Sequence, residues 1–172
     1  RVMSQLVAQR SMPGAELRSH EPLQLTSVFE PARLKMGFSA KSVARREGKS
    51  LRLRVPIDWT PSAGFVLKNR TYPLLLGVPR TMKWRVELTI PSGAKASQLP
   101  DSVRLQSRCM AFERQVTTKA NLVSITQSVT IRCERIPAKE YTEHRAVANE
   151  ISAVLNQGLS ITMKGTALAL GR

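Results

Sequence analysis

Residues that commonly carry chemistry are scarce in this sequence. Its 172 residues include only two cysteines, two histidines, two tryptophans and two tyrosines. No CxxC pair and no histidine–cysteine group with zinc-ligand spacing occurs, so no metal site is expected. There is no GxGxxG sequence and no P-loop, so no nucleotide cofactor is expected either.

Long apolar runs are also missing. No stretch approaches the roughly 20 apolar residues that span a bilayer, and the first residues, RVMS, lack a signal-peptide layout. A mature or excised chain would have lost such a signal, so this start does not locate the protein. Because 42% of the residues are hydrophobic, we still expect a globular fold with a real core.

Acidic residues are few: 12 Asp and Glu stand against 27 Lys and Arg, for a net charge of +15. This balance favours acidic partners such as nucleic acid, lipid headgroups, acidic polysaccharide or an acidic domain. Few aromatic side chains are present to stack bases, so nucleic acid is the least favoured. The densest basic cluster is KSVARREGKSLRLR, and its candidate partner-binding residues are Arg45, Arg46, Lys49, Arg52 and Arg54.

Part of this cluster has a plainer explanation. In LRLRVPI, residues 51–57, the apolar side chains alternate with arginines. Such alternation predicts a half-buried strand whose polar face is solvated. The segments 83–90 and 159–164 alternate in the same way, and Pro22 and Pro31 mark edge positions in one or two strands over 15–38.

The clearest hairpin joins 103–118 to 122–136 around Lys119-Ala120-Asn121. A turn at Ala120-Asn121 pairs apolar residues across the strands: Phe112 with Val129, Val116 with Ile125, and Met110 with Ile131. In this register Cys109 faces Arg132, and we favour two unbonded, buried cysteines. The alternative is a one-residue slip that faces Cys109 with Cys133 for a disulfide, but it turns the apolar side chains to the wrong face.

A helix is predicted directly after this hairpin. Pro137 suits a first helical turn, and residues 138–156 carry apolar positions at helical spacing (Tyr141, Val147 or Ala148, Ile151, Val154 or Leu155). Gly158 provides the stop signal. We therefore predict a mainly β fold, an antiparallel β-sandwich over 15–172 with this late helix packed on the sheet, preceded by a short helix or linker over 1–14.

No catalytic group can be assembled from these elements. Cys109 and Cys133 lie within predicted strands, and His144 falls on the helix stripe, where it could pair with Glu140. His20 has no partner in sequence, and the aspartates Asp58 and Asp101 suit turns. We therefore expect no catalytic, cofactor-binding or metal-binding residues in this chain.

Four short stretches occur in an order that resembles the C-terminal β-rich part of bacterial transglutaminase-like proteins. In those proteins a papain-like core lies between two β-rich domains of unknown function. The resemblance is best between 65 and 157, MPGAELRSHE at 12–21 looks like the linker that leaves the core, and the stretches are RTYPL at 70–74, LTIPSG at 88–93, LPDSV at 99–103 and RIPAKEYTEHRA at 135–146.

The resemblance implies that the catalytic Cys, His and Asp of such a protein lie upstream, because none of them maps onto this chain. It implies a non-catalytic accessory module that packs on a catalytic core or another protein. It also implies a periplasmic or extracellular location, with a cytoplasmic one as the alternative. The residues alone leave open a stand-alone basic protein that binds an acidic polymer.

Overall fold

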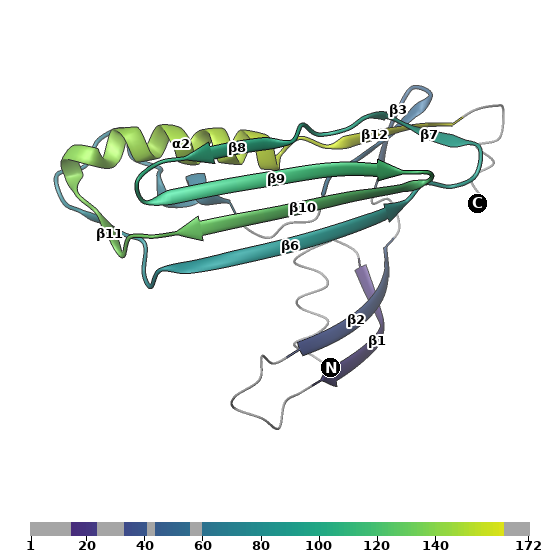
Figure 1. The fold of residues 1–172 in the computed structure, drawn as a ribbon, viewed down its shortest axis with the longest axis horizontal. Helices are drawn as coiled ribbons and strands as arrows, with labels where there is room; N and C mark the ends of the chain where they lie inside the picture. Colours follow the sequence, from purple (N-terminus) through teal and green to yellow (C-terminus); the bar gives the residue numbers. More distant parts are fainter. Residues whose placement is uncertain (1–14, 24–32, 41–43, 56–59, 164–172) are drawn as a thin grey trace. The chain divides into compact units, whose positions relative to one another are not determined.

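The computed structural model describes residues 15–23, 33–40, 44–55 and 60–163 (Figure 1). The short helix predicted over 1–12 and the boundary predicted at residue 14 lie outside these residues. The chain forms two compact units, which are described separately: the first comprises Arg1–Arg45 and Pro56–Asp58, and the second comprises Arg46–Val55 and Trp59–Arg172.

The first unit contains one antiparallel hairpin. Strand β1 (Ala15–Leu23) pairs with β2 (Arg33–Ala40), with an irregularity between Leu17 and Ser19. Among the described residues this sheet has two strands, so each of them is an edge strand there. Such an edge accommodates the missing N–H of Pro22, as the sequence pattern predicted.

The larger sheet of the second unit holds the predicted long hairpin. Its strand order is β6 (Arg80–Thr89), β10 (Leu122–Ile131), β9 (Met110–Lys119) and β8 (Val103–Gln106), all antiparallel. The predicted register is confirmed, since Phe112 faces Val129, Val116 faces Ile125 and Met110 faces Ile131. The tight turn places Ala120 in the left-handed region, at a φ of 52°.

A second four-stranded sheet has the order β3 (Ala44–Glu47), β4 (Ser50–Leu53), β12 (Leu159–Met163) and β7 (Ala94–Gln98). Two short elements complete the strands: β5 (Leu74–Leu75) pairs with β11 (Arg135–Ile136). A 3₁₀ helix, η1 (Pro61–Gly64), precedes β5. The division between the two units falls within β3, after Arg45.

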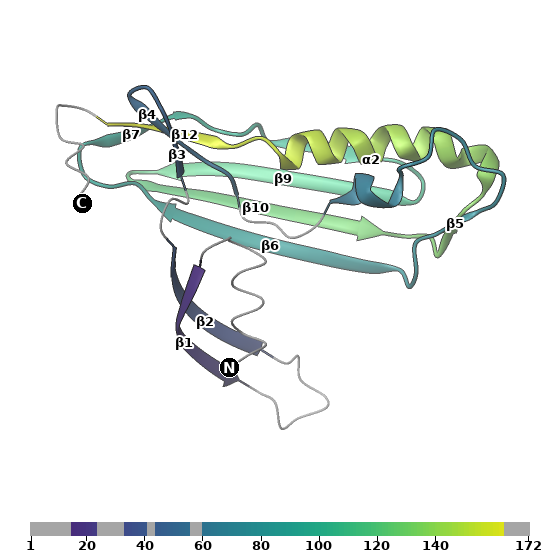
Figure 2. The same ribbon diagram turned by 180° about the vertical axis from the view of Figure 1, so that it is seen from behind.

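The late helix forms where it was predicted. A 3₁₀ turn, η2 (Ala138–Glu140), leads into α2 (Tyr141–Leu155). Figures 1 and 2 show α2 and then β12 lying in line along the larger sheet. Gly158 is not a left-handed helix stop, because its φ is not positive. Instead a Cβ there would lie 2.8 Å from the Leu53 carbonyl oxygen, so glycine allows β4 to approach closely.

The core of the second unit lies between α2 and the inward faces of β9 and β10. Burial of a large apolar side chain contributes about 1.5–3 kcal/mol. The prediction of a mainly β, antiparallel fold with one late helix is confirmed. The inward stripe of the helix is Tyr141, His144, Ala148, Ile151, Ser152 and Leu155, and the strands contribute Met110, Phe112, Val123, Ile125, Val129 and Ile131.

Candidate functional site

The most unusual surface of the second unit is a short apolar one. Across the part of the chain that the structure describes, seven large apolar side chains are exposed, and five of them fall within residues 66–78. We call these five the apolar segment: Val66 (74% exposed), Leu67 (50%), Tyr72 (77%), Leu75 (77%) and Val78 (75%). Exposed apolar side chains that gather in one place mark interaction sites more often than scattered ones do.

Helix α2 fixes the backbone just before this segment and at its start. Three of its side chains reach backbone groups that lie 74 to 90 residues earlier in the chain. The bonds are Ser62 N–H to Ser152 Oγ (3.1 Å), Arg145 Nε to the Phe65 carbonyl (3.2 Å) and Tyr141 OH to the Leu67 carbonyl (2.9 Å). We call these three bonds the helix clamp. Phe65 is buried and stacks on Tyr141, with ring centroids 5.6 Å apart, so its neighbour Val66 is turned outward.

The second half of the segment is held by β11 and by one arginine. The Leu76 N–H donates to the Glu134 carbonyl at 2.7 Å, which extends the short ladder between β5 and β11. Arg80 NH1 donates to the carbonyls of Leu76 and Val78, at 3.2 and 3.1 Å. The exposed side chains of Leu75 and Val78 are therefore attached to an ordered backbone.

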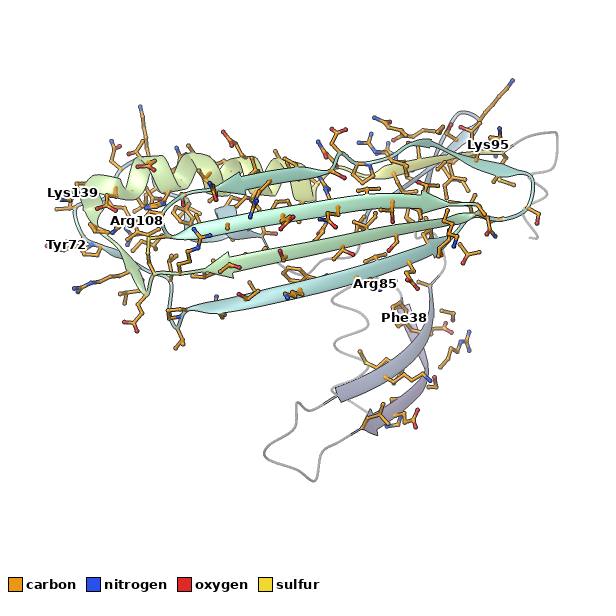
Figure 3. The ribbon with its side chains drawn as sticks, in the orientation of Figure 1. Phe38, Tyr72, Arg85, Lys95, Arg108 and Lys139 are labelled. Carbon is orange, nitrogen blue, oxygen red and sulfur yellow. A yellow bond between two sulfur atoms is a disulfide. The ribbon has the colours of Figure 1, made fainter. Side chains whose placement is uncertain are left out.

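Basic residues surround the apolar segment. Residues 65–80 contain three basic residues and no acidic one. Arg70 lies over the ring of Tyr141, with its Cζ 5.6 Å from the centroid. Figure 3 shows Tyr72, Arg108 and Lys139 at the same end of the second unit. The basic residues of this surrounding surface are Lys68, Arg70, Arg80, Arg135 and Lys139.

The structure places four of the five predicted partner-binding residues, Arg46, Lys49, Arg52 and Arg54, on or beside the β3–β4 hairpin of the second unit, all exposed. Arg45, also exposed, falls on the other side of the division between the units. Three of the four have partners: Arg46 donates to the Gly48 carbonyl at 3.3 Å, Arg52 lies 3.9 Å from Glu47, and Arg54 donates to Asn156 Oδ1.

The two cysteines form a disulfide, contrary to our expectation. The register was right, because the Arg132 N–H donates to the Cys109 carbonyl at 2.8 Å. The regular ladder, however, ends at Met110 and Ile131. Cys109 and Cys133 lie beyond the ends of this ladder, where the register no longer fixes which side chains face each other. Their Cα atoms are 5.0 Å apart, within the range of a disulfide.

His144 contacts the turn that precedes Cys109 and is buried, with 1% exposure. Its Nδ1 is 2.8 Å from Ser107 Oγ, and its Nε2 is 3.8 Å from Glu140 Oε2. Glu140 is therefore a close neighbour of His144, as the sequence suggested, at a distance too long for a hydrogen bond. The Ser107 hydroxyl also accepts the Met110 N–H at 3.2 Å, and Arg108 pairs with Glu140. This arrangement fixes the turn before β9 against the first turn of α2.

Sequence reasoning missed a buried arginine at the other end of the helix. Arg114 donates to the Asp101 carbonyl (3.0 Å), the Val154 carbonyl (3.0 Å) and Gln157 Oε1 (2.6 Å). Burial lowers its pKa, and the charge of Asp101 opposes that shift. The alternation of Met110, Phe112, Arg114 and Val116 was the available signal, since it places Arg114 on the inward face.

Gln127 is buried directly across from Arg114, in the same row of the larger sheet. Among the residues that the structure describes, neither atom of its side-chain amide has a hydrogen-bond partner. His20 is exposed on β1 and faces Met36, and Asp58 lies outside the described residues. Within the described ranges no three His, Cys, Asp or Glu side chains gather as metal ligands would, and no helix is long and apolar enough to cross a membrane.

Comparison with known proteins relates this chain to one family and to one solved structure. A family model described as a domain of unknown function with a solved structure, DUF3858, matches residues 53–161. A crystal structure described as a "putative protease" from Parabacteroides distasonis ATCC 8503 is similar, with a TM-score of 0.52 and 18% identity. The similarity covers 62% of this chain but only 21% of that longer one. Among curated proteins, none matches the sequence.

Proposed function

The chain belongs to the DUF3858 family, and we propose that it is a non-catalytic accessory module of a larger, exported bacterial transglutaminase-like protein. In this proposal it packs on a papain-like catalytic core that another part of the polypeptide supplies. The similar crystal structure supports a module of this kind, because the likeness spans only 21% of that chain.

The observation that carries the proposal is the disulfide. A papain-like reaction needs a cysteine thiolate as its nucleophile, activated by a histidine. The chain has two cysteines, and each is bonded to the other. The nearby His144 is buried and engaged with Ser107 and Glu140. The thiol of such a protein would therefore come from outside this module.

The same bond supports an exported location. Disulfides persist in oxidising surroundings, such as the periplasm and the extracellular space, and are rare in the cytosol. A module that works there benefits from a covalent link between β9 and β10.

Two measurements test the proposal. The intact mass of the native polypeptide that carries this segment should lie well above the 19.1 kDa of this chain. The amine-transfer or peptide-hydrolysis activity of that polypeptide should persist in the Cys109→Ser/Cys133→Ser and His144→Ala variants, with folding checked by circular dichroism. A native mass of 19.1 kDa, or loss of activity in variants that still fold, contradicts the proposal.

A second candidate function is the binding of an acidic polymer by the β3–β4 hairpin. The observation that favours it is the exposure of Arg46, Lys49, Arg52 and Arg54 on this one hairpin, with Glu47 as the acidic residue between them. Binding of this kind should weaken steeply between about 50 and 200 mM salt. Unchanged binding after charge reversal at Arg46 and Arg52 would contradict it.

A further inference from the structure

We propose that the apolar segment is a docking surface for a folded protein domain whose own surface is apolar at the centre and acidic around it. The inference rests on the proposed function, in which that domain belongs to the same longer polypeptide. It assigns the contact to Val66, Leu67, Tyr72, Leu75 and Val78, and so to the end of the second unit where α2 begins.

The apolar segment is ordered before any partner binds. The helix clamp holds its backbone at the start, and the ladder to β11 holds it around Leu75. Four of its five side chains nevertheless remain about three-quarters exposed. A surface that is already ordered loses less conformational entropy on binding, so it converts more of its contact energy into affinity.

The core of the module lies close to the apolar segment, but the exposed side chains of the segment are not buried in it. Phe65 is 3% exposed and Ile136 is fully buried, while their neighbours Val66 and Leu75 point away from the same core. Exposed aliphatic side chains together with a tyrosine are typical of the centre of a protein interface. Arg70, beside Tyr141, adds the residue type that is most enriched there with Tyr and Trp.

The surface around the apolar segment is mainly basic. Residues 65–80 and the adjoining stretch 134–140 carry five basic residues, Lys68, Arg70, Arg80, Arg135 and Lys139, and two acidic ones, Glu134 and Glu140, of which Glu140 pairs with Arg108. A complementary partner is therefore acidic around its apolar centre. A second copy of this chain fits poorly, because a twofold contact would bring identical basic surfaces together.

A membrane surface could also satisfy apolar and basic groups. The geometry favours a protein, because interfacial membrane segments are amphipathic helices that present Trp, Phe or Leu along one face. Here the side chains project from a loop and a two-residue strand, with Glu134 beside Arg135 in the same ladder.

The test uses the native polypeptide with the photocrosslinking residue p-benzoylphenylalanine in place of Tyr72. The matched control carries it in place of Thr126, an exposed residue on the polar outer face of the larger sheet, between Arg85 and Gln115. We expect an adduct at position 72 with a peptide from another domain of the same polypeptide. We expect no such adduct at position 126.

A second measurement uses Leu75→Ser/Val78→Ser. In this 172-residue chain alone, the melting temperature should shift by no more than about 2 °C, because both side chains are exposed. In the longer polypeptide it should fall by about 4 °C or more, because buried contacts are lost.

Several outcomes overturn the inference and leave the proposed function standing. They are an adduct with a second copy, an adduct with lipid, no adduct at position 72, or equal melting shifts in the two proteins. A native polypeptide of 19.1 kDa overturns the proposed function itself, and the docking surface with it. The two failures are therefore distinguishable by mass alone.

Discussion

The polar side chains at the two ends of helix α2 have different effects on the residues around them. At the C-terminal end, Arg114 binds the Val154 carbonyl and Gln157, and Arg54 binds Asn156. At the N-terminal end, Tyr141 and Arg145 bind backbone carbonyls and leave Val66 and Leu67 exposed. At the C-terminal end the polar side chains connect the helix to neighbouring parts of the core; we call this the closed end. At the N-terminal end they hold backbone from which apolar side chains point into solvent.

This difference separates structural polar groups from ones that prepare a surface. A closed end needs only to satisfy its own hydrogen bonds, and removal of its polar group should cost stability alone. At the other end, polar groups order apolar side chains that stay exposed, so these bonds do not increase burial within the module. The comparison can be tested by removing polar groups at each end in turn.

The largest effect is expected at the closed end. Arg114→Ala should lower the free energy of unfolding by about 2–5 kcal/mol, because a buried side chain is lost and its acceptors stay buried without a donor. Urea denaturation of the whole chain measures this. The control is Arg104→Ala on β8, an exposed arginine whose loss should change stability by about 0.5 kcal/mol or less. Equal effects of the two variants would contradict the structural role of Arg114.

The position of Arg114 could be predicted from sequence, but its partners could not. Alternation over 110–116 places it inward, between Phe112 and Val116. Its acceptors at Val154 and Gln157 lie 40 and 43 residues away, beyond any local pattern. The strands and the late helix were predictable for the converse reason, since their periodicity is local.

The disulfide shows a different limit. The register of the β9–β10 hairpin was predicted residue by residue, yet the bond between Cys109 and Cys133 was not expected. Two unbonded cysteines were expected only if the ladder continued past Met110 and Ile131, which it does not. The apolar segment lacks strand or helix periodicity, so no pattern in it distinguishes inward from outward side chains.

A smaller effect is expected from the disulfide at the N-terminal end. Cys109→Ser/Cys133→Ser should lower the free energy of unfolding by about 2–4 kcal/mol, because the bond closes a chain segment with a sequence separation of 24. The same loss should appear in the unchanged protein after full reduction, and reduction should not affect the double variant. A stability that does not respond to either treatment would show that the bond does not form.

The smallest effect tests the helix clamp itself. Tyr141→Phe keeps the ring that stacks on Phe65 and lies under Arg70, and removes only the hydroxyl that donates to the Leu67 carbonyl. The free energy of unfolding should fall by about 1 kcal/mol. Amide hydrogen exchange should become faster over residues 65–68, with little change in β9 or β10.

Tyr72→Phe provides the matched control, because it removes the same hydroxyl from a side chain that is 77% exposed. It should leave both stability and exchange within error. If Tyr141→Phe also left the exchange of residues 65–68 unchanged, the bond from Tyr141 to the Leu67 carbonyl would not order the apolar segment. The outward side chains of Val66 and Leu67 would then owe their position to Phe65, to η1 and to the bond from Arg145, and the Tyr141 hydroxyl would be no part of what distinguishes the N-terminal end of α2.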